Sequence, residues 1–152
     1  MTNSRDRFFL YIHCRDLAEM RRFYSDLVGL GEIYASDEAV GYLHGSVQFT
    51  ILEAADAPPG TEQWHRQPGW SGGQSPLPSW SFQVSDLQDY GDAVGRLRDE
   101  SVRSFFDVPK WQGYWSFPVK DPEGNTVELT YAPARAPQTE QPSWPPASCP
   151  EP

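Results

Sequence analysis

The sequence predicts an α+β fold of two tandem β-α-β-β-β modules, which form an open, cupped, mixed or antiparallel sheet with the helices outside. The first observation is an internal repeat, because residues 10–17 (LYIHCRDL) align with residues 80–87 (WSFQVSDL) at a constant offset. The second is that apolar residues at helical spacing follow each copy, and the third is that strand-like segments follow each helix. A repeat of this size predicts two copies of one supersecondary unit.

The first module begins with a strand over residues 8–14, which is dense in aromatic and β-branched side chains. Asp16 is placed to cap a helix that begins at Leu17, and apolar residues then recur at helical spacing. Gly29 is expected to end this helix, because glycine adopts the left-handed backbone found at helix C-termini. Three further strands are predicted over residues 32–34, 40–43 and 47–53.

The second module repeats this order from Trp80. Asp86 is placed to cap its helix, as Asp16 caps the first. Strands are predicted near residues 102–106, 113–119 and 126–131. The tight turn at residues 121–124 (DPEG) joins the last two strands as a hairpin, because its proline presets φ and its glycine suits the fourth turn position.

We expect one domain over residues 1–131, since 152 residues are enough for one compact core and too few for two ordinary ones. Module 1 covers about residues 7–53 and module 2 about 79–131. Residues 54–78 form a long loop between them, and residues 132–152 form a Pro-rich tail that cannot fold alone.

Three tryptophans lie outside the predicted modules. Trp64 and Trp70 in the long loop favour packing on a partner subunit or over a ligand, although a flexible linker is the alternative. Trp144 in the tail is a candidate anchor onto a neighbouring chain. The loop and tail would suit an arm exchanged within a homodimer.

Composition excludes several classes of partner. The formal net charge of -9 repels phosphate backbones and acidic bilayers, so we expect neither nucleic acid nor a membrane as a partner. No apolar run approaches the length of a membrane span, and the N-terminus lacks the apolar segment of a secretory signal. Two cysteines make no disulfide framework, which fits a cytoplasmic location.

The last strand carries a carboxylate on the polar face of a sheet. Period-2 alternation puts Val127, Leu129 and Tyr131 on one face, and Glu128 and Thr130 on the other. A carboxylate there needs solvent, a donor, a cation or a ligand. The residues expected to line a shared cavity are Phe9, Tyr11, His13, Phe49, Ser79, Ser81, Gln83, Trp111, Tyr114, Glu128 and Thr130, with Ser116 as a further position.

The motif DPEGNTVEL at residues 121–129, together with the two strand-Asp-Leu helix starts, resembles the vicinal oxygen chelate superfamily of glyoxalases, extradiol dioxygenases and fosfomycin and bleomycin resistance proteins. The resemblance covers roughly residues 8–131. It implies metal ligands seven residues before each capping Asp, which are Phe9 and Ser79 here, and a Glu on each last strand. Glu128 matches that Glu, but residues 49–52 offer no carboxylate, so we expect neither a metal nor another cofactor.

An aromatic wall opposite a hydrogen-bonding one suits a rigid aromatic ligand. Our leading interpretation is a metal-free, dimeric binding protein of the bleomycin-resistance type, which sequesters an aromatic or polycyclic natural product and has no catalytic residues. The alternative is a glyoxalase-like lyase or isomerase, or a dioxygenase, that uses Glu128 with His13. The interpretation that we favour for His13 itself is a strand histidine hydrogen-bonded to a neighbour.

Overall fold

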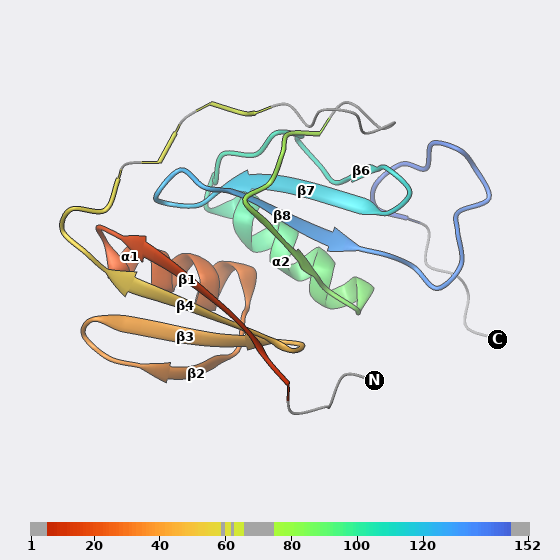
Figure 1. Cartoon of the computed structure of the whole chain (residues 1–152). Helices are drawn as coiled ribbons and strands as arrows, with labels where there is room; N and C mark the ends of the chain where they lie inside the picture. The colour runs from red at the N-terminus through yellow and green to blue at the C-terminus, as the bar shows by residue number, and fades with distance from the viewer. Residues whose placement is uncertain (1–5, 59, 62, 66–74, 147–152) are drawn as a thin grey trace. The chain divides into compact units, whose positions relative to one another are not determined.

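The structure, a computed structural model, describes residues 6–58, 60–61, 63–65 and 75–146 (Figure 1). The predicted Trp70 contact therefore lies outside the described residues. The chain divides into two compact units. The first is formed by residues 1–62 together with 121–125, and the second by residues 63–120 together with 126–152.

The first unit contains the first predicted module. Its elements are β1 (Phe8–Cys14), α1 (Leu17–Arg21), η1 (Arg22–Val28), β2 (Glu32–Ala35), β3 (Ala39–His44) and β4 (Val47–Glu53). The strands form a four-stranded sheet in the order β1-β4-β3-β2, in which β1 runs parallel to β4 and the other pairs are antiparallel. The predicted helix thus exists, but its second half is a π-helix that ends at Gly29 with φ of 88°.

The second unit repeats this arrangement, with α2 lying along one face of its sheet (Figure 1). Its elements are β5 (Trp80–Gln83), α2 (Leu87–Asp99), β6 (Lys110–Trp111), β7 (Trp115–Lys120) and β8 (Thr126–Tyr131). The sheet order is β5-β8-β7-β6, with β5 parallel to β8. Two four-stranded mixed sheets with helices confirm the predicted α+β class and its tandem modules. The shared cavity stays a prediction.

Both helices begin at the predicted aspartates. The side chain of Asp16 accepts a hydrogen bond from the Glu19 N–H at 3.1 Å, and that of Asp86 accepts one from the Asp89 N–H at 3.0 Å. Each bond satisfies an N–H that the first turn of a helix leaves without an internal partner. The repeated strand-Asp-Leu sequence therefore fixes where each helix starts.

Each unit buries an aromatic core between its helix and one face of its sheet. In the first unit, the ring of Tyr24 packs edge-on against Phe49, with ring centroids 5.3 Å apart. In the second, Tyr90 is fully buried and its hydroxyl donates to the Leu129 carbonyl oxygen at 3.1 Å. Trp115 is 1% exposed on the same side. The opposite face of each sheet carries polar side chains, several of which are also buried, among them Thr50, Ser116 and Glu128.

The prediction of a strand at residues 102–106 is wrong. This segment makes one isolated bridge, between Ser104 and Val119, and the strand that pairs with β7 is β6. The Phe105 N–H donates to the Pro118 carbonyl oxygen at 2.9 Å. Pro118 has no N–H with which to return that bond, so the ladder cannot continue.

The tail folds back onto its own unit. The ring of Trp144 packs edge-on against Tyr90 and Trp115, with centroid distances of 5.5 and 5.2 Å. Trp144 therefore has a packing site on its own chain, and its contact with a neighbouring chain stays a prediction. No helix in the described part of the chain has the length and apolar character that a bilayer crossing requires.

Candidate functional site

The candidate site is built around Glu128 in the middle of β8. Its neighbours Val127 and Leu129 are fully buried on the helix side, so alternation turns Glu128 to the face away from α2. Ser81 on β5 and Pro118 on β7 are its register partners. Glu128 is 6% exposed.

Three hydroxyl groups surround the Glu128 carboxylate, and we call them with Glu128 the hydroxyl cradle. Ser81 Oγ donates to Oε1 at 2.7 Å, and Ser116 Oγ donates to Oε2 at 2.6 Å. The Tyr114 hydroxyl lies 3.5 Å from Oε2, which is a weaker contact. All three donors were among the residues that the sequence placed on this face, and the cradle brings them together.

The cradle keeps Tyr114 protonated. Burial, and then the negative charge of Glu128, raise the pKa of the Tyr114 hydroxyl above its usual value. A phenol is already protonated at neutral pH, and the cradle disfavours its ionisation further, so the hydroxyl can donate towards the carboxylate. The Glu128 carboxylate is thus held by three uncharged donors, which are Ser81 on β5, Ser116 on β7 and Tyr114 just before β7.

The side of the cradle towards β5 is exposed. Ser81 and Gln83 on β5 are exposed, and Gln83 pairs in register with Thr130, which is half-buried. Ser79 is also exposed, and its N–H donates to the Thr126 carbonyl oxygen at 2.8 Å. These exposed polar residues lie beside the carboxylate of Glu128, which is itself 6% exposed.

Trp64 from the long loop packs on the same unit. The Lys120 Nζ lies 4.8 Å from the centre of the Trp64 ring, and the Arg103 guanidinium lies 5.3 Å from it. The ring also packs edge-on against Phe105 at 5.4 Å. Cation–π contacts of this kind hold an indole in place. The loop tryptophan therefore contacts its own chain, which does not test whether it also covers a ligand.

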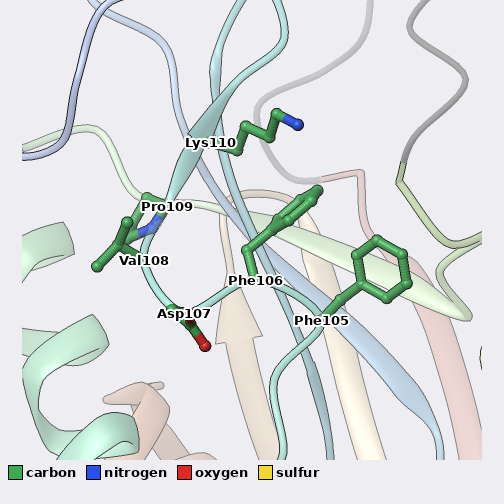
Figure 2. A pocket seen from close by; sticks show the side chains of 6 residues that line it. All are labelled: Phe105, Phe106, Asp107, Val108, Pro109 and Lys110. Carbon is green, nitrogen blue, oxygen red and sulfur yellow. The ribbon is translucent and has the colours of Figure 1, made fainter.

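A shallow, open pocket lies beside this cluster, along residues 105–110 (Figure 2). Its volume is about 400 Å³, and it is formed by a single segment. Figure 2 shows the rings of Phe105 and Phe106 on one side of the segment, while Val108 and Pro109 lie on the other. The Lys110 Nζ lies 5.2 Å from the centre of the Phe106 ring. Two charged residues, Asp107 and Lys110, also line it, but all six lining residues come from this one exposed segment.

In the first unit, β1 presents an aromatic face away from the helix. Phe9 and Tyr11 are 50% and 57% exposed, and His13 is exposed two residues further along. Beside them the Tyr34 ring lies over Gly41, where an added Cβ would come within 2.2 Å of the ring. The Tyr34 hydroxyl donates to Thr50 Oγ1 at 3.0 Å.

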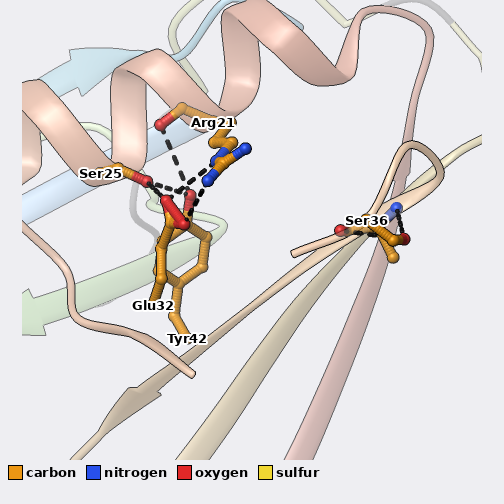
Figure 3. A network of polar contacts seen from close by, with 6 residues as sticks. Arg21, Ser25, Glu32, Ser36 and Tyr42 are labelled. Carbon is orange, nitrogen blue, oxygen red and sulfur yellow. Dashed lines mark hydrogen bonds and ion pairs between the residues drawn. The ribbon is translucent and has the colours of Figure 1, made fainter. Parts of the chain in front are cut away.

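A polar network on the helix side fixes the edge of the first sheet (Figure 3). Arg21 donates to both carboxylate oxygens of Glu32 on β2, at 3.0 and 2.7 Å. Ser25 donates to Glu32 at 2.6 Å and lies 2.8 Å from the Tyr42 hydroxyl. The Arg21 hydrogen bonds lower the pKa of Glu32, while burial raises that of Tyr42 to about 12. This network joins helix to sheet and is structural.

Comparison with known proteins identifies the family. The family model of the glyoxalase/bleomycin resistance protein/dioxygenase superfamily matches residues 8–129, which is well over half of the chain. The chain belongs to this superfamily. No curated protein matches the chain.

Solved structures of the superfamily share the fold at low sequence identity. A glyoxalase/dioxygenase from Nostoc punctiforme is 14% identical with a TM-score of 0.63, over 86% of this chain and 93% of that one. A fosfomycin resistance protein from Mesorhizobium loti is 17% identical with a TM-score of 0.53, over 84% and 91%. A lactoylglutathione lyase from Agrobacterium tumefaciens is 17% identical with a TM-score of 0.54, over 82% and 91%. These likenesses show the fold alone.

The residues at the superfamily's metal positions do not fit a divalent metal. In the internal repeat, Tyr11 corresponds to Ser81. Tyr11 pairs in register with Thr50, and Ser81 pairs with Glu128. Thr50 is therefore the residue of the first sheet that corresponds to Glu128. With Phe9 and Ser79 at the remaining positions, the donors are one carboxylate and two neutral hydroxyls. Divalent metals need several imidazole, thiolate or carboxylate ligands. Within the described ranges, no three His, Cys, Asp or Glu side chains gather as a metal site.

Two of the predicted site residues lie on the wrong face. Phe49 is 1% exposed and packs against Tyr24 on the helix side, because it shares a face with its register partner Leu10. Trp111 pairs in register with Trp115, and their rings pack edge-on at 5.5 Å on the helix side. Neither ring lies on a face with Glu128 or with Phe9.

The sequence analysis also missed one residue of the first unit. Tyr34 was not recognised as a residue of the open face, although Gly41 opposite it was a signal, since a strand glycine marks a close approach. His13 lies in the first unit and Glu128 in the second, and the described contacts of Glu128 are all to hydroxyl groups. The acid–base pair of His13 and Glu128 remains a prediction.

Proposed function

We propose that this member of the superfamily is a small-molecule binding protein, which sequesters an aromatic or polycyclic natural product, such as an antibiotic, without a metal. The observation that carries the proposal is the hydroxyl cradle of Glu128. A carboxylate held by Ser81, Ser116 and Tyr114 is oriented for a ligand, because fixed polar groups at a partly exposed edge determine how a small molecule binds.

The chemistry of the other positions supports binding over metal catalysis. The place of a metal ligand in the first module is taken by the exposed ring of Phe9, and Tyr11 beside it is also exposed. Exposed rings on a strand offer stacking area to a planar ligand. Resistance proteins and lyases both occur among the structures with this fold, so the fold itself does not decide between the two.

The test is a titration of chelator-treated protein with planar polycyclic antibiotics, for example an anthracycline and a tetracycline. We expect saturable quenching of tryptophan fluorescence with about one ligand per chain, since aromatic stacking brings the ligand close to indole rings. Mass spectrometry of the released ligand should show the unaltered compound. Steady conversion of the ligand to a new product would instead support the lyase, isomerase or dioxygenase alternative.

A matched pair of variants locates the binding site. Glu128→Gln removes the charge at the cradle, while Glu140→Gln removes an exposed carboxylate in the tail. We expect Glu128→Gln to weaken binding and Glu140→Gln to leave it unchanged. Equal effects of the two substitutions would mean that the ligand responds to overall charge and not to the cradle.

A further inference from the structure

Among the residues that the structure describes, no cationic side chain pairs with the charge of Glu128. Each of its described contacts is to an uncharged hydroxyl, from Ser81, Ser116 or Tyr114. Glu128 is 6% exposed, and no ion pair to it is formed by the residues that the structure describes. Taking a carboxylate out of water is costly unless an opposite charge or several strong donors replace the solvent.

The basic residues near this face are directed elsewhere. The Lys120 Nζ donates to Thr126 Oγ1 at 3.0 Å and to the Gln63 carbonyl oxygen at 2.7 Å, and it lies over the Trp64 ring. The Lys110 Nζ lies over the ring of Phe106. Both ammonium groups therefore bind carbonyls, hydroxyls or rings, and neither bonds to the Glu128 carboxylate.

We propose that the hydroxyl cradle binds an organic cation, that is, a protonated amine or amidinium group carried by the aromatic ligand. This inference rests on the proposed function and names the chemical class of its ligand. A carboxylate can accept about four hydrogen bonds, and the two short hydroxyl bonds use only two of these lone-pair directions, so the carboxylate can still accept N–H bonds from a ligand. Charge-assisted bonds of this kind are about twice as strong as neutral ones.

The approach to the cradle and the charge of the whole chain favour the same ligand class. Ser81 and Gln83 are exposed and uncharged, so a cation entering along β5 meets no like charge from them. The formal net charge of -9 attracts cations over longer range and repels anions. A neutral ligand is not attracted by the net charge, and the lack of positive charge along β5 does not help it.

The experiment compares three planar tricyclic probes that differ in charge: 9-aminoacridine as the cation, acridone as the neutral compound and 9-anthracenecarboxylate as the anion. Dissociation constants are measured with chelator-treated wild-type protein by isothermal titration calorimetry. We expect the cation to bind at least about tenfold more tightly than acridone, because hydrogen bonds to charged groups contribute more than neutral ones. The anion should bind most weakly.

Variants at Glu128 separate charge from shape. Glu128→Gln should weaken binding of 9-aminoacridine about tenfold or more and change acridone binding less than about threefold. Glu128→Asp keeps the negative charge and should keep the preference for the cation. This second variant tests the inference even if the Gln variant does not fold. The control Glu140→Gln should leave all three constants unchanged.

The failures of the two proposals look different. If cation, neutral probe and anion bind equally well, or if Glu128→Gln leaves their ratio unchanged, the cation inference is wrong while the binding function stands. Loss of the cation preference in Glu128→Asp would also contradict the inference. If none of the three probes and none of the antibiotics binds, the binding function itself is wrong.

Discussion

The hydroxyl of Tyr24 donates a 2.6 Å hydrogen bond to Oδ2 of Asp121, across 97 positions of sequence. The same carboxylate accepts N–H bonds from Glu123 and Asn125, at 2.9 Å each, and a third from the Asn125 side chain at 2.9 Å. Glu123 in turn accepts from the Arg15 N–H at 2.6 Å, just before helix α1. The DPEGN turn is therefore a structural part of the first unit.

Removing the Tyr24 hydroxyl is expected to destabilise the protein. Asp121 is 4% exposed, so Tyr24→Phe leaves a buried acceptor short of a donor and should cost about 1–3 kcal/mol. Urea denaturation followed by circular dichroism measures the change. Tyr34→Phe is the control, because Tyr34 is 42% exposed and its hydroxyl bonds to the neutral hydroxyl of Thr50 and not to a carboxylate, so it should cost less, about 0.5 kcal/mol. Equal costs would contradict the buried role of the Tyr24 bond.

Gly41 is expected to tolerate a side chain only if Tyr34 is shortened. An added Cβ would meet the Tyr34 ring at 2.2 Å, so Gly41→Ala should displace that ring and cost about 1–3 kcal/mol. In a Tyr34→Ala background the same substitution should cost much less. A double-mutant cycle of unfolding free energies measures the coupling, which we expect to be at least about 0.5 kcal/mol. Additive costs would show that the ring does not lie over Gly41.

Cys14 is expected to resist alkylation in the folded protein. It is fully buried, and burial, followed by the charge of Glu123, raises the pKa of its thiol to about 11. Iodoacetamide at pH 8, with peptide mass spectrometry, should label Cys14 slowly in buffer and rapidly in urea. Equal labelling rates under the two conditions would contradict its burial.

The same thiol gives a pH dependence of stability. Its folded-state pKa lies above the unfolded value of 9.0, so the protonated thiol contributes stability that is present below pH 9 and is lost as the pH rises towards about 11. The difference in unfolding free energy between wild type and Cys14→Ala should therefore shrink over that interval. A difference that grows instead would mean that the sign of the shift is wrong.

Trp144 is expected to stabilise its own chain. Because its ring packs on Tyr90 and Trp115 and is half-buried, Trp144→Ala should cost about 1–2 kcal/mol. The midpoint of thermal unfolding, measured at several protein concentrations, then distinguishes a tail that packs within its own chain from one exchanged between two chains. If the loss caused by Trp144→Ala is the same at all protein concentrations, the tail packs within one chain; a loss that grows with concentration would support an exchanged arm in a homodimer.

Local sequence signals predicted the fold well where one physical cause dominates. Asp16 and Asp86 marked both helix starts, because an aspartate just before apolar residues at helical spacing is typical of a helix N-cap. The period-2 pattern of β8 placed Glu128 on the sheet face away from α2, and the same alternation placed Ser81 and Tyr114 on that face. The core of the hydroxyl cradle was thus accessible from sequence.

The errors arose where pairing between segments decides the structure. Trp111 was placed with the ligand because its pairing with Trp115 across the turn was not counted, and the pairing puts both rings on the helix side. The strand predicted at residues 102–106 failed because of Pro118 in a different strand. The bond between Tyr24 and Asp121 depends on tertiary folding, and no local pattern indicates it.

The most direct test of the central claim is to measure the affinity of chelator-treated protein for 9-aminoacridine, before and after addition of Zn²⁺ or Mn²⁺. Our account holds that Glu128 binds the ligand and that Phe9, Ser79 and Thr50 cannot complete a metal site. It predicts saturable binding without metal and a dissociation constant that either metal leaves unchanged. Binding that appears only after a metal is added would contradict it.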